Sequence, residues 1–373
     1  MKKIMFYRLK ILNSALLIIF MFSAPNIFGQ LAPKYSNEFL SLGIGARNLG
    51  MGNSTVSSSK DVTAIYWNPA SLAEIDKKFD IGLMHSEYFA GIAKYDFIGI
   101  NYKIDLKSSI ALSMIRFGVD DIPNTLDLFD SYGNIHYDRI SSFSASDYAF
   151  IGSYSRKVFV EGLSIGANVK LIRRKAGDFA GAWGFGFDVA AKYNYKNWKF
   201  GVNIKDITST FNAWQYNQSQ LRDIFIITGN TVPQNGLELT LPKILLGTAY
   251  LFNIKDKVSI MPEICLPITT DGKRNTLIKS NAISIDPSMG LEIGYVNLVF
   301  IRAGVNNFQT ITDIDGEEHF SCQPNIGVGL KYKWFSVDYA FTNIGNQGVS
   351  LYSHVFSLGI SFDTKKKESA SRY

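Results

Sequence analysis

From Phe79 onward the chain alternates apolar residues with polar or small ones at a period of two. In segment 183–195, for example, Phe185 and Phe187 alternate with Gly184 and Gly186. This period is typical of strands that have one apolar face and one polar face. Fourteen such segments can be identified, at residues 79–89, 95–104, 109–117, 148–156, 162–174, 183–195, 197–205, 243–252, 258–266, 286–295, 298–305, 324–332, 334–341 and 353–362.

The length and number of these segments favour a membrane barrel. A tilted strand needs about 9–11 residues to cross a bilayer, and most of the segments are of that length. An even number of antiparallel strands can close into a barrel that has no free edge. We therefore predict an all-β fold, a 14-stranded antiparallel transmembrane β-barrel over residues 79–362.

The connections between the segments support the same prediction. Those after even-numbered segments are short, for instance Val296–Asn297, and those after odd-numbered segments are long, with 90–94 as the exception. Outer-membrane barrels have tight periplasmic turns and longer outer loops, whereas a soluble sandwich has no reason to show this asymmetry. Aromatic residues near strand ends match an interfacial girdle: Tyr195, Trp198, Tyr295, Tyr332 and Phe335. The long connections are 118–147, 206–242, 267–285 and 306–323.

The two ends of the chain differ in composition from the barrel. Residues 1–29 are predicted to be a secretory signal peptide, with basic residues at Lys2 and Lys3, an apolar stretch at 15–22, and Gly29 at the cleavage point. Residues 363–373 form a basic tail. These ends account for most of the net charge of +6, so the rest of the chain has no basic footprint for nucleic acid. We predict an outer-membrane location, with the N- and C-termini periplasmic.

The stretch from Phe39 to Ala73 fits neither the signal nor the strands. It is rich in glycine and ends with Trp67-Asn68-Pro69-Ala70. A dinucleotide-binding loop would need a preceding strand and a helix after the last glycine. Here a serine-rich run, 54–59, follows instead, which favours a compact segment packed against something larger.

This stretch resembles the N-terminal signature of the PorV/PorQ family of outer-membrane proteins, which are similar in fold to the FadL group of hydrophobic-compound transporters. The resemblance is specific over residues 39–75 and general over the barrel. It implies that residues 30–75 form a hatch, or plug, inside the barrel lumen. The matching residues of the motif are Gly43, Gly45, Ala46, Arg47, Gly50, Met51, Gly52, Asp61, Trp67, Asn68, Pro69 and Ala70.

The residues themselves are consistent with a plug. The inward faces of the strands are rich in Gly, Ser, Ala and Asn, which leaves room for a backbone to enter. Pro69 is expected to end a preceding turn or short helix, and Asn68 to bond nearby backbone. A buried Arg47 needs a carboxylate partner. Four acidic residues are candidates by strand parity, and the sequence does not choose among them: Asp188, Glu263, Glu292 and Asp338.

Neither catalysis nor a metal site is predicted. The four histidines are dispersed, and no Gly-x-Ser-x-Gly motif is present. The run from Asp313 to Glu317 lacks the ligands of a calcium loop, so a polar outer turn is favoured. Cys265 and Cys322 are isolated, and we expect them to be unpaired. No enzyme activity and no cofactor are expected.

Two further sets of residues are candidate binding sites. Lysines and arginines on inward faces are expected to meet water or the plug rather than to form an anion path. They are Lys170, Arg174, Lys192, Lys199, Lys205, Arg302 and Lys331. Exposed aromatic residues on the outer connections are candidates for partner binding. The alternative is that these side chains only pack within their own loops. They are Phe129, Tyr132, Trp214, Tyr216 and Phe225.

The first functional hypothesis follows from the resemblance, which implies a part in type IX protein secretion. The chain would bind or shuttle exported cargo proteins at the outer membrane, with a translocon barrel as a partner. The alternative is a FadL-like transporter of hydrophobic small molecules, and a third possibility is a structural barrel or adhesin. Transport predicts an apolar pocket beside Trp67 and a gap in the wall, whereas secretion predicts a plugged lumen and a protein-binding outer surface.

Overall fold

The structure is a computed structural model that describes residues 36–363, except 90, 127, 131, 228–230, 232–233, 313–314 and 344–351. The predicted signal peptide, the first residues of the predicted hatch and the basic tail after Asp363 lie outside this range. Within the described range, no helix has the length and apolar character that crossing a bilayer requires.

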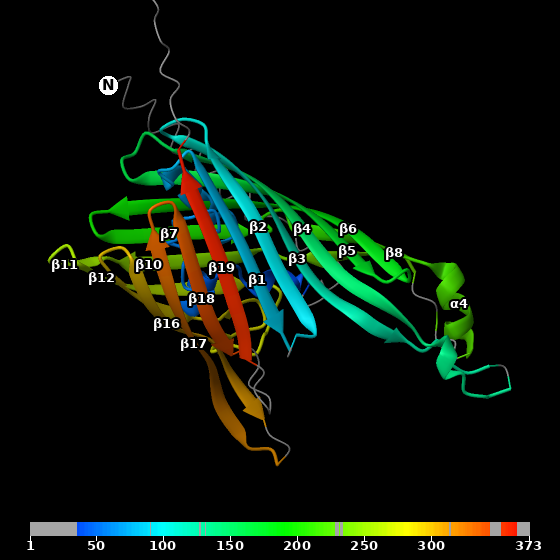
Figure 1. Cartoon of the computed structure of the whole chain (residues 1–373). Coiled ribbons are helices and arrows are strands. Elements are labelled where there is room, and N and C mark those ends of the chain that lie inside the picture. The colour runs from blue at the N-terminus through cyan, green and yellow to red at the C-terminus, as the bar shows by residue number, and fades with distance from the viewer. Residues whose placement is uncertain are drawn as a thin grey trace, which may run out of the picture. The chain divides into compact units, whose positions relative to one another are not determined.

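Fourteen strands form a closed antiparallel barrel, which confirms the predicted fold class (Figure 1). Each strand pairs with the next, and β19 closes the ring against β1, with Phe362 opposite Phe79. The strands of the wall are β1 (Phe79–Tyr88), β2 (Ala93–Lys103), β3 (Ser108–Asn124), β4 (Ser141–Lys157), β5 (Leu163–Ala176), β6 (Ala180–Tyr195), β7 (Trp198–Lys205), β10 (Lys243–Tyr250), β12 (Val258–Thr269), β15 (Ser288–Tyr295), β16 (Val299–Thr312), β17 (Glu318–Tyr332), β18 (Phe335–Asn343) and β19 (Tyr352–Phe362).

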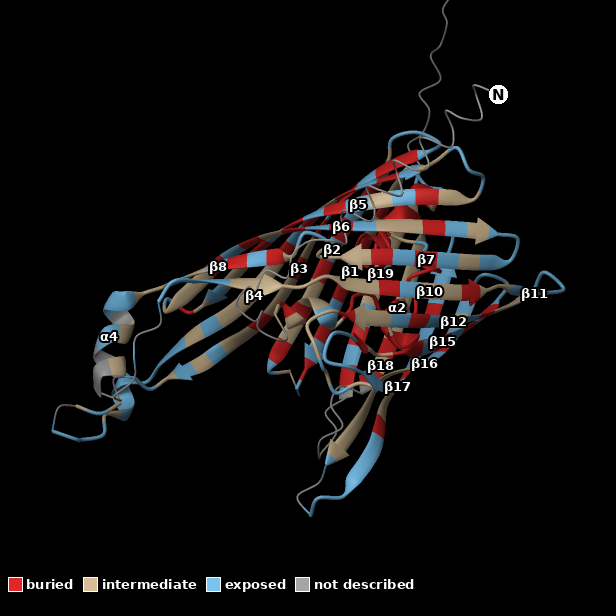
Figure 2. Ribbon diagram, turned by 180° about the vertical axis from the view of Figure 1, so that it is seen from behind, coloured by how far each residue is buried: buried red, intermediate tan, exposed pale blue. Residues whose placement is uncertain are grey.

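Over most of the wall an apolar face points outward, as a membrane barrel requires. Strand β15 shows the rule. Ser288, Gly290 and Glu292 are buried in the lumen, while Leu291 and Ile293 are exposed on the outside. The alternation of buried and exposed residues is visible along β7, β10 and β15 in Figure 2. The outer wall is therefore built to contact lipid.

The connections differ from the prediction in five places. The predicted connection 118–147 is shortened because β3 runs to Asn124 and β4 begins at Ser141. Most of the predicted connection 306–323 is strand, because β16 runs to Thr312 and β17 begins at Glu318. Connection 206–242 is not a loop, because it contains β8 (Thr210–Tyr216), α4 (Gln218–Ile227) and β9 (Gly236–Thr240). Connection 267–285 contains the short strands β13 (Ile278–Lys279) and β14 (Ser284–Ile285). Strands β5 and β6 are joined by residues 177–179 alone, so the first odd connection is not the only short one.

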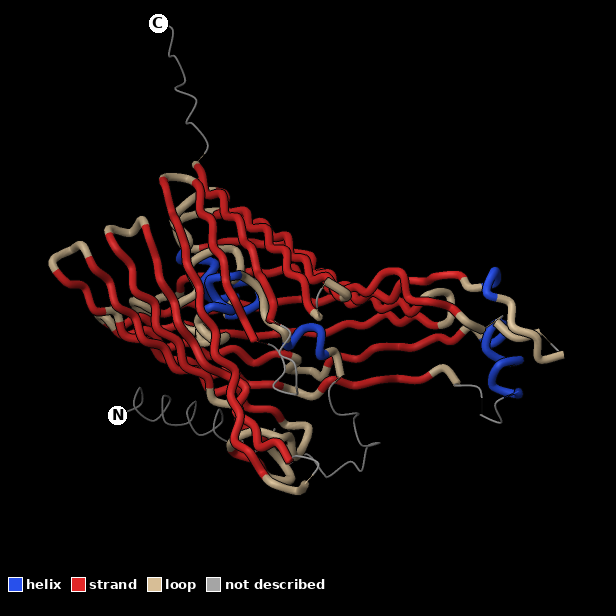
Figure 3. The backbone as a smooth tube through the Cα atoms, turned by 60° about the horizontal axis from the view of Figure 1, so that its bottom comes forward, coloured by secondary structure: helices blue, strands red, loops and turns tan. Residues whose placement is uncertain are grey.

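On one side the sheet continues past the barrel as a wing, formed by the far ends of β3, β4, β5 and β6 with β8 and β9. Strand β8 pairs with β6, and β9 pairs with β8. In both Figure 1 and Figure 3 the wing ends at α4 and the tip of the β3–β4 connection, which includes η3 (Tyr137–Arg139). On the short-turn side, β11 (Phe252–Ile254) extends the β10–β12 turn.

The described part of the hatch, residues 36–75, lies inside the barrel. It contains η1 (Glu38–Ser41), α2 (Ala46–Gly50), α3 (Ala64–Trp67) and η2 (Pro69–Glu74). One side of it shares an apolar core with the inner faces of β1 to β5, where Tyr95, Ile115 and Ile172 are fully buried. The other side faces polar strands, so the lumen is apolar on one side and charged on the other.

The periplasmic location of both chain ends stays a prediction, because the ends lie outside the described residues. Ser36, the first described residue, donates to Glu238 and contacts Thr240 of β9, at the end of the barrel with the long connections. Asp363 lies at the opposite, short-turn end, where it accepts hydrogen bonds from Lys77 and Lys78. The described chain thus enters the lumen at one end and leaves the wall at the other.

The outward apolar face gives a test of membrane insertion. Val169 on β5 is 46% exposed and Ile278 in a connection is 55% exposed. In a soluble protein arginine would be tolerated equally at either site. In a bilayer Val169→Arg is expected to cost about 2–4 kcal/mol, and Ile278→Arg close to nothing.

The free energy of folding into lipid vesicles, measured by urea titration, compares the two variants. Equal stabilities would contradict the outward, lipid-facing placement of Val169.

Candidate functional site

The hatch backbone lies directly against glycines of the barrel wall. A Cβ atom on Gly304 would overlap the Met51 carbonyl carbon, and one on Gly290 would come 2.9 Å from the Met51 Cβ. On the other side, a Cβ on Gly166 would meet the peptide between Pro69 and Ala70. These inward glycines are required because backbone approaches backbone there, as the composition of the inward faces predicts.

The first glycines of the motif act inside the hatch. Gly43 and Gly45 both have φ of +87°, a conformation that other residues rarely adopt. A Cβ on Gly43 would come 2.9 Å from Cζ2 of Trp67. The Trp67 indole N–H donates to the carbonyl of Ile44 at 2.8 Å. The motif therefore closes on itself, with its last aromatic residue packed on its first glycine.

Asn68 and Pro69 perform the local roles that the sequence predicts. Helix α3 ends at Trp67, Asn68 is extended, and Pro69 begins η2. The Asn68 side chain is fully buried. Its Nδ2 donates to the carbonyl of Val56 at 2.9 Å, and its Oδ1 accepts from the N–H of Ala70. One side chain thus fixes two turns of the hatch.

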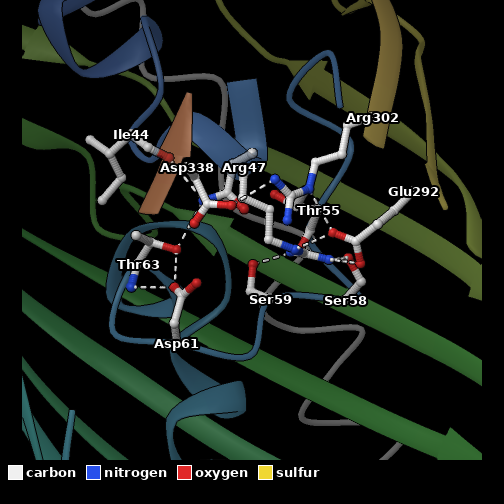
Figure 4. A network of polar contacts seen from close by, with 11 residues as sticks. Ile44, Arg47, Thr55, Ser58, Ser59, Asp61, Thr63, Glu292, Arg302 and Asp338 are labelled. Atoms are coloured by element: carbon white, nitrogen blue, oxygen red, sulfur yellow. Dashed lines mark hydrogen bonds and ion pairs between the residues drawn. The ribbon is translucent and has the colours of Figure 1, made fainter. Parts of the chain in front are cut away.

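An ionic cluster joins the hatch to the polar side of the wall (Figure 4). Arg47 on α2 donates through Nε to Oε2 of Glu292 at 2.8 Å and through Nη2 to Oε1 at 3.2 Å. Arg302 on β16 donates to the same Oε2 at 2.8 Å and to Asp338 at 2.7 Å. Because Glu292 is shared by two guanidinium groups, it is the centre of the cluster.

Arg47 stays charged in this setting. Burial would lower the pKa of its guanidinium group, but the adjacent Glu292 carboxylate outweighs burial and holds the pKa above its ordinary value. Of the four predicted carboxylate candidates, Glu292 is therefore the one that contacts Arg47. Nearby, Asp61 of the motif accepts from the backbone N–H of Thr63 at 2.9 Å, which shapes the start of α3.

The other three candidates have different partners. Glu263 accepts from the N–H of Ser57 at 2.7 Å and from its hydroxyl at 2.6 Å. Asp188 pairs with Lys170 at 2.7 Å. Asp338 pairs with Arg302 of the wall. Glu263 thus binds the hatch directly, whereas the other two organise the wall around it.

The predicted inward cations are mostly paired. Lys170 bridges Asp188 and Asp206, and Lys192 pairs with Glu74 of the hatch at 2.8 Å. Arg174 pairs with Asp147 at 2.9 Å and with Glu238 on the wing. Lys205 stands over the Tyr66 ring, with its Nζ 3.2 Å from the ring centroid. Buried cations need such partners, because an unpaired charge in the lumen would be costly.

Two cavities lie in the lumen, on opposite sides of the hatch, and they share no lining residue. The one at the long-connection end has a volume of about 550 Å³, and Trp67, Lys205 and Asp188 line it. The one at the short-turn end has a volume of about 630 Å³ and is lined by Arg47, Asp61 and Lys331. The hatch thus separates two charged cavities.

The predicted outer aromatic residues do not form one patch. Phe129 and Tyr132 are 61% and 90% exposed at the tip of the β3–β4 connection. Trp214 and Tyr216 are only partly exposed, because they lie in β8 with their rings stacked at 6.2 Å, and Arg174 covers Trp214. Phe225 is half-buried in α4. Only the first two fit the expectation of exposed loop aromatics.

No group of three or more potential metal ligands occurs among the described residues, and Cys265 and Cys322 are free thiols. The wing and α4 were missed because strand-length alternation is weak there. The sharing of Glu292 by Arg47 and Arg302 was also missed, since it depends on three elements that are distant in the sequence.

Comparison with known proteins places the chain in a family. Residues 34–226 match the family described as type IX secretion system protein PorV. The chain belongs to the PorV family. The matched region spans the hatch, β1 to β7 and the first part of the wing.

Solved structures agree on the fold. The chain is similar to the CymD monoaromatic hydrocarbon channel (13% identity, TM-score 0.54), with 87% of this chain and 98% of that one covered. It is also similar to the toluene transporters TbuX of Ralstonia pickettii (13%, 0.53; 86% and 98% covered) and TodX of P. putida (13%, 0.54; 86% and 99% covered). No curated protein matches the sequence. At these identities the similarity concerns the barrel fold alone.

The centre of the ionic cluster can be tested by Glu292→Gln. Removing the charge leaves Arg47 and Arg302 buried without their common partner, which typically costs about 3–5 kcal/mol. We expect the hatch to loosen, and single-channel conductance in planar bilayers to rise. Glu318→Gln, at an exposed position of β17, is the matched control and is expected to leave conductance unchanged.

The contact between backbones gives a second test. Gly304→Ala places a methyl group where the Met51 backbone lies, whereas Gly152→Ala adds one that meets only Leu112 at 3.6 Å. Protease digestion of the two variants in detergent would compare them. We expect faster cleavage within residues 36–75 for Gly304→Ala alone. Equal cleavage rates would argue against close packing at Gly304.

Proposed function

We propose that this PorV-family barrel acts in type IX secretion, where it binds or shuttles exported cargo proteins at the outer membrane, in contact with a translocon barrel. The proposed role is non-enzymatic. Membership in the PorV family supports it, and the plugged lumen is the observation that carries it.

The plug is tied to the wall around its circumference. Arg47 binds β15, Ser57 binds Glu263 on β12, and Asn68 donates to the carbonyl of Ala191 on β6 at 3.2 Å. On the apolar side, Ile65 and Leu72 are fully buried. A hatch held this way favours a closed barrel whose outer surface does the binding.

The alternative, a transporter of hydrophobic small molecules, is supported by the fold that the chain shares with a hydrocarbon channel and with toluene transporters. Two observations weigh against it. The cavity beside Trp67 is lined by charged groups such as Lys170, Asp188 and Lys205 rather than by apolar ones alone. All fourteen junctions of the wall are paired, including the closure of β1 against β19.

The wing tip is the proposed contact surface for protein partners. Phe129 and Tyr132 are highly exposed there. The β3–β4 connection that carries them ends beside α4 (Figure 1). Large exposed aromatic residues are frequent anchors of protein interfaces. The proposed boundaries of the parts are the signal peptide at 1–29, the hatch at 30–75, the barrel at 79–362 and the tail at 363–373.

The test is a mild-detergent purification of the tagged chain from native outer membranes, followed by mass spectrometry of bound proteins and lipids. We expect a very large translocon barrel or exported cargo to accompany the chain. In Phe129→Ser/Tyr132→Ser, the loss of two aromatic anchors should lower its recovery about fivefold or more. Phe320→Ser, which removes an aromatic ring that is 66% exposed on β17, outside the wing, is the control.

A stoichiometric hydrophobic small molecule, with no protein partner, would contradict the secretion role and favour transport. Unchanged recovery in the double variant would instead contradict the wing tip as the contact surface.

A further inference from the structure

The short-turn end of the barrel carries lysines in almost every turn. Two stand before β1, and at least one lies in or beside each of the turns 104–107, 158–162, 196–197, 255–257 and 333–334. The turn 296–298 is the exception. Six of these lysines are used in the argument, and the described structure gives none of the six an ion-pair partner: Lys78, Lys107, Lys157, Lys196, Lys255 and Lys333.

The acidic residues at this end do not neutralise the lysines. The Asp363 carboxylate forms an ion pair with Lys77, with 2.8 Å between Oδ2 and Nζ. The Asp105 carboxylate accepts the backbone N–H groups of Lys107 and Ser108, so it holds the turn. Asp76, Glu161 and Asp256 remain, fewer than the lysines. The rim is therefore positively charged.

Beside these lysines stand exposed apolar or aromatic side chains. Leu106, next to Lys107, is 84% exposed, and Phe159, two residues after Lys157, is fully exposed. Lys196 has its Nζ 5.5 Å from the ring centroid of Tyr195, and Lys333 has its Nζ 5.1 Å from that of Tyr332. Exposed apolar turn tips are unfavourable in water but favourable at a membrane interface.

We propose that this lysine rim binds the phosphate groups of anionic glycerophospholipids, while the neighbouring apolar side chains enter the acyl region. Juxtamembrane lysines attract anionic lipid, and long lysine side chains reach the headgroup layer from strand ends. Short turns of outer-membrane barrels face the periplasm, which directs the rim to the glycerophospholipid leaflet. The inference rests on the barrel's membrane placement and not on the secretion role.

The test is native mass spectrometry of the full chain in detergent with added phosphatidylglycerol, phosphatidylcholine or lipid A, the first two with identical acyl chains. We expect the chain to retain phosphatidylglycerol in preference to phosphatidylcholine. Lys107→Gln/Lys196→Gln/Lys333→Gln should reduce that preference about tenfold or more, since each lysine near the surface contributes about 1 kcal/mol.

Two controls separate charge from folding. Lys94→Gln/Lys175→Gln/Lys279→Gln removes three lysines from the long-connection end and should keep the preference. Arginine at the three rim positions should also keep it. Heat-modifiable migration on denaturing gels verifies that each variant is a folded barrel.

Three results would overturn the proposal. The glutamine variant could keep the preference, or the control at the other end could lose it equally. The rim variant could also lose lipid A and not phosphatidylglycerol, which would place the rim in the other leaflet.

A separate variant, Leu106→Ser/Phe159→Ser, tests the apolar contacts. It should weaken retention of both glycerophospholipids alike, because the contacts of Leu106 and Phe159 with acyl chains do not distinguish headgroups.

Discussion

The structure depends on the close contact between the hatch backbone and the glycine-lined inner wall. A fourteen-stranded barrel encloses a space that side chains of the wall alone do not fill. Here Gly166, Gly290 and Gly304 have no side chain, so hatch peptides can lie directly against the strands. Once the backbone is that close, its polar groups must be satisfied by buried side chains of the wall, such as Glu263, and of the hatch itself, such as Asn68.

The two sides of the lumen hold the hatch by different means. Toward β1 to β5 the contact is apolar, with Tyr95, Ile115 and Trp67 in one core. Toward β12 to β18 it is ionic, with Glu292 between Arg47 and Arg302. Apolar packing is strong but adaptable, whereas buried ion pairs demand one geometry. The ionic side therefore sets the position of the hatch, and the apolar side supplies much of its stability.

The barrel also differs between its two ends. The long-connection end carries the wing, with exposed aromatic side chains suited to protein contacts. The short-turn end carries the lysine rim and exposed apolar tips suited to a lipid headgroup layer. In the proposed function the wing would bind partners, while the proposed lipid contacts of the rim would hold the opposite end in the bilayer. The hatch, in between, keeps the two cavities apart.

The sequence alone determined the architecture of the wall, because period-two alternation is a local property and the bilayer sets the strand length. It also marked the hatch, whose glycines, Trp67 and Asn68 act on near neighbours in the chain. Only the tertiary structure decided which carboxylate meets Arg47, because all four candidates had the right parity and only the barrel's closure brings Glu292 to α2. The wing was decided in the same way. Strand β8 forms because β6 extends past the barrel and offers it an edge, and β9 then pairs with β8. These pairings are not encoded in the short sequences of β8 and β9 themselves.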